Sequence, residues 1–170
     1  MASRSRRART GRPTARCAPK PPHERLPVHE APAVSETQVR VNYSETDQMG
    51  VVYHGRYVVW LDVARTEHLR HAGFSYKDLE AEGIRLVVTD LRVRYRLPAR
   101  YDDLVRIRCW VKDVASRRVV FGYAIEDSAS GTLFATAVTD LICLDQTHRL
   151  SRLPDKVRRT LVAVSDPVRL

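Results

Sequence analysis

The chain has 170 residues, 44% of them hydrophobic and 29% charged, which is enough for one domain with a substantial core. Its formal net charge of +9 is concentrated in residues 1–35, where eight Lys/Arg stand against two Glu, so the rest of the chain carries only about +3. A charge of about +3 is ordinary for a soluble domain and does not indicate nucleic-acid binding by it. No apolar run approaches the roughly 20 residues of a bilayer span.

Residues 1–35 differ from the rest of the chain in composition. They hold six of the nine prolines and almost no large apolar side chain before Leu26. Such a segment buries too little surface to offset its ordering entropy, so we expect a disordered basic tail, followed by one domain over residues 36–165. A start codon assigned too far upstream, a targeting role, and binding of nucleic acid or an acidic surface are alternative interpretations of this tail.

The three cysteines lie far apart in the sequence, at Cys17, Cys109 and Cys143. Their odd number and wide spacing form neither a CxxC metal pattern nor a disulfide framework. The cysteine usage therefore favours a reducing cytoplasm as the location of the protein.

The first part of the domain predicts a strand, a turn and two helices. Residues 38–43 alternate between polar and apolar side chains, as a strand does, and a polar turn over 44–50 follows. A helix is predicted over 55–72, and a short second helix over 75–83. The apolar stripe of the long helix is expected to comprise Val58, Leu61, Arg65, Leu69 and Ala72.

Residues 84–145 alternate with a period near two and predict four strands. The apolar faces of the first three are expected to comprise Val87, Leu91, Val93 and Tyr95, then Val105, Ile107, Cys109 and Val111, then Val119, Phe121, Tyr123 and Ile125. Residues 133–144 predict the fourth. Because the breaks between these strands are short, we expect consecutive strands to be antiparallel neighbours. A final helix is predicted over 154–164.

These elements indicate an α+β protein, with one long helix and a short one set against about five antiparallel strands. A single sheet of this kind leaves one face to cover, so we expect the sheet to wrap around the long central helix. Its long edge strands favour pairing with a second copy of the chain.

The segment most informative about chemistry is YSETDQMGVVYHGRYVVWLD, residues 43–62. Asp47 lies in a short polar turn with Gly50, and the long helix is predicted to begin near His54 and Gly55. A helix N-terminus presents unpaired backbone N–H groups that stabilise a negatively charged oxygen. A carboxylate beside such a site is what hydrolysis of an activated acyl group requires.

The longer segment YSETDQMGVVYHGRYVVWLDVARTEHLRHAGF closely resembles the signature of the hotdog-fold acyl-CoA thioesterases, in the lineage of 4-hydroxybenzoyl-CoA thioesterase and the YbgC-type hydrolases. The similarity continues through LVVTDLRVRYRLPARYDDLVRIRCWV and covers about residues 38–160. It implies a hotdog fold, acyl-CoA substrates, neither metal nor cofactor, and homodimers with a continuous sheet that often pair into tetramers.

By the same resemblance, Asp47 matches the catalytic carboxylate of the family, and Gly50 the glycine that lets the turn approach the substrate. His54, or its backbone N–H, matches the position that opens the helix and polarises the thioester carbonyl together with Gly55. Tyr53 matches an aromatic position beside the site. The alternative interpretation of Asp47 is an Asx-turn or helix cap, and that of His54 is a residue whose backbone alone takes part.

Asp62, Arg117 and Arg118 are the further residues that the resemblance places near the substrate. Asp62 matches an acid that faces the acyl pocket in aryl-specific members, and an exposed helix carboxylate is the alternative. Arg117 and Arg118 match a hairpin that in some members contacts the phosphates of coenzyme A. A solvated hairpin tip is the alternative interpretation of this pair.

The resulting hypothesis is hydrolysis of an acyl-CoA thioester to a free carboxylic acid and coenzyme A. The N-terminus of the central helix would polarise the carbonyl, and Asp47 would act as the nucleophile or as the general base for a water. Two alternatives stay open: a hotdog hydratase or dehydratase acting on acyl thioesters, and a non-catalytic binder of acyl-CoA or of an acyl-carrier protein.

Overall fold

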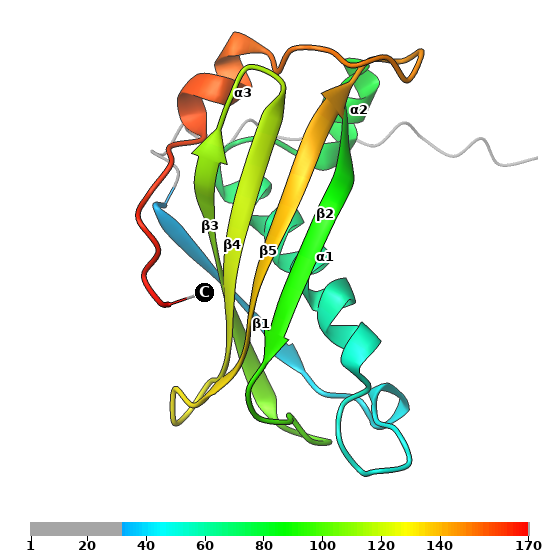
Figure 1. The fold of residues 1–170 in the computed structure, drawn as a ribbon, viewed down its shortest axis with the longest axis vertical. Helices are drawn as coiled ribbons and strands as arrows, with labels where there is room; N and C mark the ends of the chain where they lie inside the picture. The colour runs from blue at the N-terminus through cyan, green and yellow to red at the C-terminus, as the bar shows by residue number, and fades with distance from the viewer. Residues whose placement is uncertain (1–31, 170) are drawn as a thin grey trace, which may run out of the picture.

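The computed structural model describes residues 32–169, so most of the predicted tail, residues 1–31, lies outside the described residues. In the described part, five strands form one antiparallel sheet in the order β1-β3-β4-β5-β2 (Figure 1). The strands are β1 (Val34–Arg40), β2 (Arg85–Tyr95), β3 (Leu104–Val114), β4 (Arg118–Asp127) and β5 (Leu133–Leu144).

The long helix α1 (His54–His71) lies along one face of this sheet (Figure 1). The prediction of five antiparallel strands around a long central helix is therefore confirmed. A 3-10 turn, η1 (Tyr43–Glu45), precedes α1, and two short helices, α2 (Tyr76–Ala81) and α3 (Asp155–Thr160), lie near the other end of the sheet.

The core lies between α1 and the sheet. The alternating residues predicted for β3 and β4 are all buried there, which confirms that pattern. Tyr57, Trp60 and Leu61 of α1 pack against them. Burying one large apolar side chain stabilises a fold by about 1.5–3 kcal/mol, so these contacts hold the orientation of α1 against the sheet.

The prediction that Val58 belongs to the buried stripe of α1 is wrong, because Val58 is 37% exposed. The buried positions of the helix are instead Tyr57, Trp60, Leu61, Ala64, Arg65, His68 and Leu69. The other four expected members, Leu61, Arg65, Leu69 and Ala72, are buried, and the buried face extends toward Tyr57, Ala64 and His68 rather than toward Val58. Val58, Val59 and Val63 are left partly exposed on the side of the helix away from the core.

Three of the four residues predicted for the apolar face of β2 are exposed: Val87 by 40%, Leu91 by 37% and Tyr95 by 46%, while Val93 packs against the core. The register of β2 against β5 shifts between Val88 and Asp90. Because an irregularity of this kind exchanges the two faces of a strand, Leu86 lies on the core side before the shift while Leu91 and Val93 do so after it.

Strands β2 and β3 are not neighbours, so the prediction that every short break joins adjacent strands is wrong at this connection. Strand β2 pairs with β5 at one edge of the sheet, and residues 96–103 cross its end to reach β3. Eight residues span up to about 26 Å, whereas three interstrand spacings need about 14 Å, so a short segment can cross two strands.

Two element boundaries also differ from the predicted ones. Strand β1 begins at Val34 and pairs with β3, so residues 34 and 35 belong to the sheet rather than to the tail. Helix α3 ends at Thr160 instead of 164. Pairing with a partner far along the chain, which no local pattern reveals, explains the early start of β1.

His68 is a buried polar residue between α1 and the sheet. Its Nδ1 lies 2.9 Å from the hydroxyl of Ser35 in β1, and its ring packs edge-on against Phe121. Burial, with a smaller contribution from neighbouring His71, lowers the pKa of His68 to about 4. The neutral imidazole is therefore the form that the fold accommodates.

We expect this histidine to make stability depend on pH. In the unfolded chain its pKa is about 6.5, so the contribution of His68 is complete above that value and is lost as pH falls toward 4. The loss amounts to about 3 kcal/mol, measurable as the free energy of urea unfolding between pH 7 and 4. His68→Gln should flatten this slope, whereas His71→Gln, on the exposed side of α1, should keep most of it. Equal slopes in wild type and His68→Gln would contradict the assignment.

Candidate active site

A short loop over residues 43–53, here called the acid loop, carries Asp47 and leads into α1. Its tip is closed by backbone hydrogen bonds: the Asp47 N–H donates to Val51 over 2.9 Å and the Gly50 N–H to Asp47 over 2.9 Å. Thr46 and Val52 form a bridge at its base. Gly50 has a φ of +73°, a conformation that costs other residues about 1–2 kcal/mol, which explains a glycine at this position.

The carboxylate of Asp47 is half-buried in the acid loop. Its Oδ1 accepts a hydrogen bond of 2.8 Å from the Met49 N–H, which is an Asx-turn contact. Among residues 32–169, Oδ2 has no hydrogen-bond partner. The turn contact therefore orients Asp47 while leaving one carboxylate oxygen available for chemistry.

Helix α1 begins at His54 with no side chain of the described residues capping it. The Arg56 N–H bonds Tyr53, whereas the N–H groups of His54 and Gly55 precede the first intrahelical bonds. A Cβ on Gly55 would lie 2.7 Å from the ring of Tyr53, so a glycine is needed for this ring to pack against the helix start. The first turn thus presents backbone donors beside the acid loop.

The side chain of His54 is exposed and lies against the Tyr53 ring, with ring centroids 4.3 Å apart. In the described part of the chain no hydrogen bond joins it to Asp47. Its backbone is held more firmly, because the Tyr95 hydroxyl donates to the His54 carbonyl over 2.8 Å. This geometry favours the backbone interpretation of His54.

Glu45 is a buried member of the acid loop that the sequence analysis did not single out. Its carboxylate accepts hydrogen bonds from Asn42, Arg56 and Trp60. A sequence signal for it did exist: Asn42 and Glu45 have the N-x-x-E spacing of a capping box, in which the acid binds the backbone N–H of the capping residue.

Asp62 lies two turns along α1 from the acid loop, and its side chain is 64% exposed. It borders a small pocket of about 80 Å³ and forms an ion pair with the buried Arg65. The pocket is lined by Val58, Leu61, Asp62, Arg65, Val88, Leu91, Tyr123 and Thr139. By helix geometry the α1 residues of this lining lie from about 6 to about 16 Å beyond His54, so the pocket lies along the helix into which the acid loop leads.

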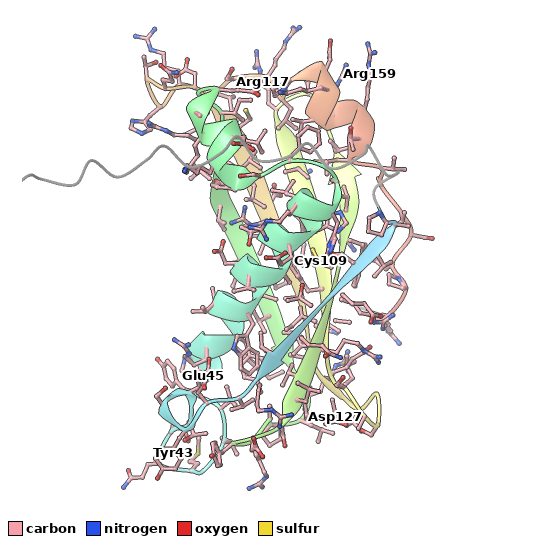
Figure 2. The ribbon with its side chains drawn as sticks, turned by 180° about the vertical axis from the view of Figure 1, so that it is seen from behind. Tyr43, Glu45, Cys109, Arg117, Asp127 and Arg159 are labelled. Carbon is pink, nitrogen blue, oxygen red and sulfur yellow. The ribbon has the colours of Figure 1, made fainter. Side chains whose placement is uncertain are left out.

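Arg117 and Arg118 lie at the opposite end of the molecule from the acid loop, as Figure 2 shows for Arg117 and Glu45. Arg118 forms ion pairs with Asp140 and Asp113 across the outer face of the sheet. Within one copy of the chain, the structure therefore does not bring these arginines together with Asp47.

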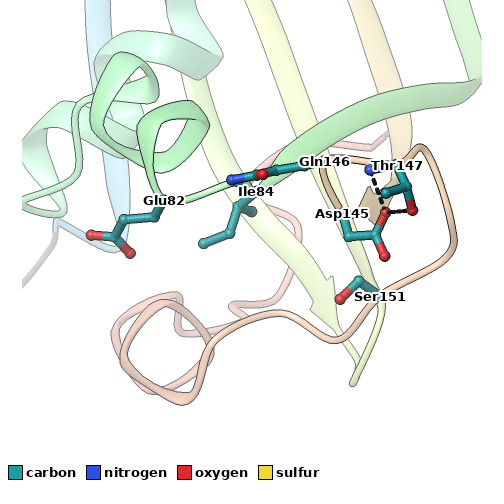
Figure 3. A pocket seen from close by; sticks show the side chains of 7 residues that line it. Glu82, Ile84, Asp145, Gln146, Thr147 and Ser151 are labelled. Atoms are coloured by element: carbon teal, nitrogen blue, oxygen red, sulfur yellow. Dashed lines mark hydrogen bonds between the residues drawn. The ribbon is translucent and has the colours of Figure 1, made fainter.

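A larger hollow of about 360 Å³ also lies at that far end, beside the start of β2 (Figure 3). Asp145 lies at its edge and stabilises a turn, in which its Oδ1 accepts hydrogen bonds from Thr147 and Arg149. This hollow is remote from the acid loop.

The described residues contain no cluster of three His, Cys, Asp or Glu side chains suited to a metal ion, and none of their helices is long and apolar enough to cross a bilayer.

Comparison with known proteins identifies the family. Residues 41–161 match the model of the thioesterase-like superfamily. The acyl-CoA thioester hydrolase YbgC of Escherichia coli is 38% identical over 125 residues, which cover 74% of this chain and 90% of that protein.

Two solved structures extend the similarity to three dimensions. A hypothetical protein from Thermus thermophilus is 38% identical, with a TM-score of 0.72, covering 75% of this chain and 96% of that one. The DHNA-CoA thioesterase from Staphylococcus aureus is also 38% identical, with a TM-score of 0.66, covering 71% of this chain and 79% of that one.

The antiparallel sheet around one long helix places the protein in the hotdog class of folds. Because the superfamily match spans most of the chain, the protein belongs to the thioesterase-like superfamily, with YbgC among its relatives. It is a thioesterase, as the motif in residues 43–62 predicts.

The pair formed by Arg65 and Asp62 yields a stability prediction. Arg65 is buried over the Tyr76 ring, and its Nη1 has no hydrogen-bond partner within residues 32–169. Replacing a buried, incompletely paired charge by an apolar side chain of similar size is often neutral or stabilising, whereas removing its partner is not. We therefore expect Arg65→Met to keep or raise the Tm and Asp62→Asn to lower the unfolding free energy by about 1 kcal/mol. A lower Tm for Arg65→Met than for Asp62→Asn, by calorimetry, would contradict this.

Proposed function

We propose that this protein hydrolyses an acyl-CoA thioester, releasing a carboxylic acid and coenzyme A, with Asp47 as the catalytic carboxylate. The observation that supports the proposal is the acid loop itself, which carries a half-buried carboxylate with one free oxygen and leads directly into the uncapped N-terminus of α1. The similarity to YbgC, an acyl-CoA thioester hydrolase, supports the same substrate class.

The helix start supplies the electrophilic half of the reaction. The thioester carbonyl oxygen accepts hydrogen bonds from the N–H groups of His54 and Gly55, and the helix dipole stabilises the negative charge that develops on it. One such donor typically contributes about 3 kcal/mol to transition-state stabilisation. The thiol of the leaving coenzyme A has a pKa of about 8.5, so it departs as a thiolate without a strong acid.

Asp47 supplies the other half. It either attacks the carbonyl carbon, forming a mixed anhydride that water then cleaves, or removes a proton from the attacking water. Both routes need one free carboxylate oxygen facing the carbonyl, and the Asx-turn contact on Oδ1 leaves Oδ2 for this. Gly50 and Tyr53 line the approach to it.

The acyl group extends along α1 toward the small pocket bordered by Asp62. This pocket, of about 80 Å³, is mostly apolar, so it suits the far end of an acyl group. It is smaller than a cavity of about 150 Å³ that holds a benzene molecule, so a large ring needs the pocket to widen or a second subunit to complete it.

A second copy of the chain is the partner that the edge of the sheet favours. Strand β2 is an edge strand of 11 residues, and Val88 and Leu91 on it are partly exposed beside the exposed valines of α1. An edge strand of this length presents unpaired backbone N–H and C=O groups, which form a template for strand pairing. We therefore propose a homodimer, or a tetramer built from two dimers. In such an assembly the hairpin with Arg117 and Arg118 of one copy can approach the coenzyme A bound to another copy.

The catalytic proposal is tested by thiol release from an acyl-CoA panel that runs from acetyl to palmitoyl and includes benzoyl types. Asp47→Asn should lose at least about 10²-fold in kcat, because the amide is neither a nucleophile nor a base. His54→Ala should lose less than about 10-fold, since its backbone N–H survives.

The matched control is Asp127→Asn. Asp127 closes a similar turn, accepting hydrogen bonds from the N–H groups of Ala129 and Ser130, in the hairpin between β4 and β5. It should keep wild-type kcat. Equal turnover by wild type and Asp47→Asn would show that another group is the catalytic carboxylate, and no turnover by wild type on any substrate would favour a carrier-protein substrate or a binder.

The oligomer proposal is tested by size-exclusion chromatography with light scattering. A lysine at an apolar edge opposes strand pairing. Val88→Lys should therefore shift the protein toward monomer, whereas Val162→Lys, at an exposed position after α3, should not. A monomeric wild type would contradict the proposal.

A further inference from the structure

Glu45 is an acid buried inside the acid loop, with only 4% of its surface exposed. Its carboxylate accepts five hydrogen bonds, which come from three residues. Figure 2 shows it at the end of the molecule where the acid loop meets α1. A buried carboxylate with this many donors holds itself and its partners in one arrangement.

The two oxygens of Glu45 face different elements. Oε1 accepts from the Arg56 guanidinium, over 2.8 and 3.2 Å, and from the Trp60 indole N–H over 3.1 Å, so it binds the first two turns of α1. Oε2 accepts from the Asn42 backbone N–H over 2.8 Å, at the chain segment that enters the loop. One side chain thus joins the entrance of the acid loop to the helix.

The backbone of Glu45 makes a further connection. Its carbonyl accepts the Tyr53 N–H over 2.9 Å, and Tyr53 is the residue that immediately precedes α1. Only Thr46, which bridges to Val52, separates Glu45 from Asp47. His54 therefore directly follows Tyr53, whose N–H binds the Glu45 carbonyl, and Asp47 lies two residues after Glu45 itself.

From this geometry we infer that Glu45 is a positioning residue, which sets the distance between the Asp47 carboxylate and the backbone donors at the start of α1. The inference rests on the catalytic role proposed above for Asp47. Glu45 itself does not meet the substrate, because its two oxygens are fully engaged with Asn42, Arg56 and Trp60.

The charge of Glu45 suits this role. Burial alone raises the pKa of a carboxyl group, but here the hydrogen bonds from Asn42, Arg56 and Trp60 and the charge of Arg56 together outweigh burial, and the pKa of Glu45 lies below its ordinary value. The side chain is thus held in its ionised form, and each of its donors makes a charge-assisted bond.

The test is Glu45→Gln, which turns one acceptor oxygen into a donor facing other donors. The matched control is Glu126→Gln. Glu126 is equally buried and is held by two arginines, Arg106 and Arg108, but it lies on the face of the sheet that α1 does not cover. Both variants lose a buried acid with arginine partners, so both should lower the Tm.

Of the two glutamate variants, only Glu45→Gln should change catalysis by the folded enzyme, measured at 25 °C on the best acyl-CoA substrate. We expect kcat to fall about 10- to 100-fold with KM within about threefold, because a shift of 1 Å in a reacting group is enough for such a loss. Arg56→Met, on the half-exposed side of the contact, should lower kcat about 3- to 10-fold. Glu126→Gln should keep wild-type kcat and KM.

A double variant separates positioning from a merely structural role. If Glu45 acts through Asp47, Glu45→Gln/Asp47→Asn should be no slower than Asp47→Asn alone, whereas multiplied losses would overturn the inference. Wild-type kcat in Glu45→Gln beside an inactive Asp47→Asn would overturn the positioning role alone. Full activity of Asp47→Asn would overturn both proposals. If Glu45→Gln does not fold, unchanged kcat in Arg56→Met decides against the inference.

Discussion

The backbone N–H groups at the start of α1 are the constraint on which the site depends. The first residues of a helix have no intrahelical acceptor, and in the described residues no side chain caps α1. The fold fixes the direction of the helix by burying Trp60 and Leu61 against the sheet, so these donors stay at the end of the helix into which the acid loop leads. Backbone N–H groups without an acceptor cost stability, but they remain free to bind a substrate oxygen, which is the source of the electrostatic catalysis proposed here.

Much of this arrangement is predictable from the sequence, because it is encoded locally. Alternation identifies the residues of β3 and β4 that face α1, and the spacing of apolar residues identifies α1. The acid loop is also local: a polar turn, a glycine with positive φ and the helix start all lie within the same short segment. For this reason the motif around Asp47 was enough to predict the thioesterase family, whereas the catalytic role of Asp47 stays a prediction.

The features that escaped prediction depend on partners far along the chain. Val58 was expected to be buried, whereas the buried face instead includes His68, whose ring nitrogen pairs with Ser35 of β1. The register shift in β2 and its place beside β5 are likewise set by cross-strand pairing. Burial of a polar residue requires a satisfied network, and no sequence pattern shows the whole network in advance.

The same reasoning separates two buried glutamates that look alike in composition. Glu126 is held by Arg106 and Arg108 on the outer face of the sheet, so its network ties neighbouring strands that hydrogen bonds already join. Glu45 ties the acid loop to the first two turns of α1, next to the groups that we propose to react. A buried charge adds little net stability to a fold but strongly specifies geometry where alternatives exist. The retention of an ionised, desolvated acid in the acid loop is therefore better explained by the precision that catalysis needs than by stability.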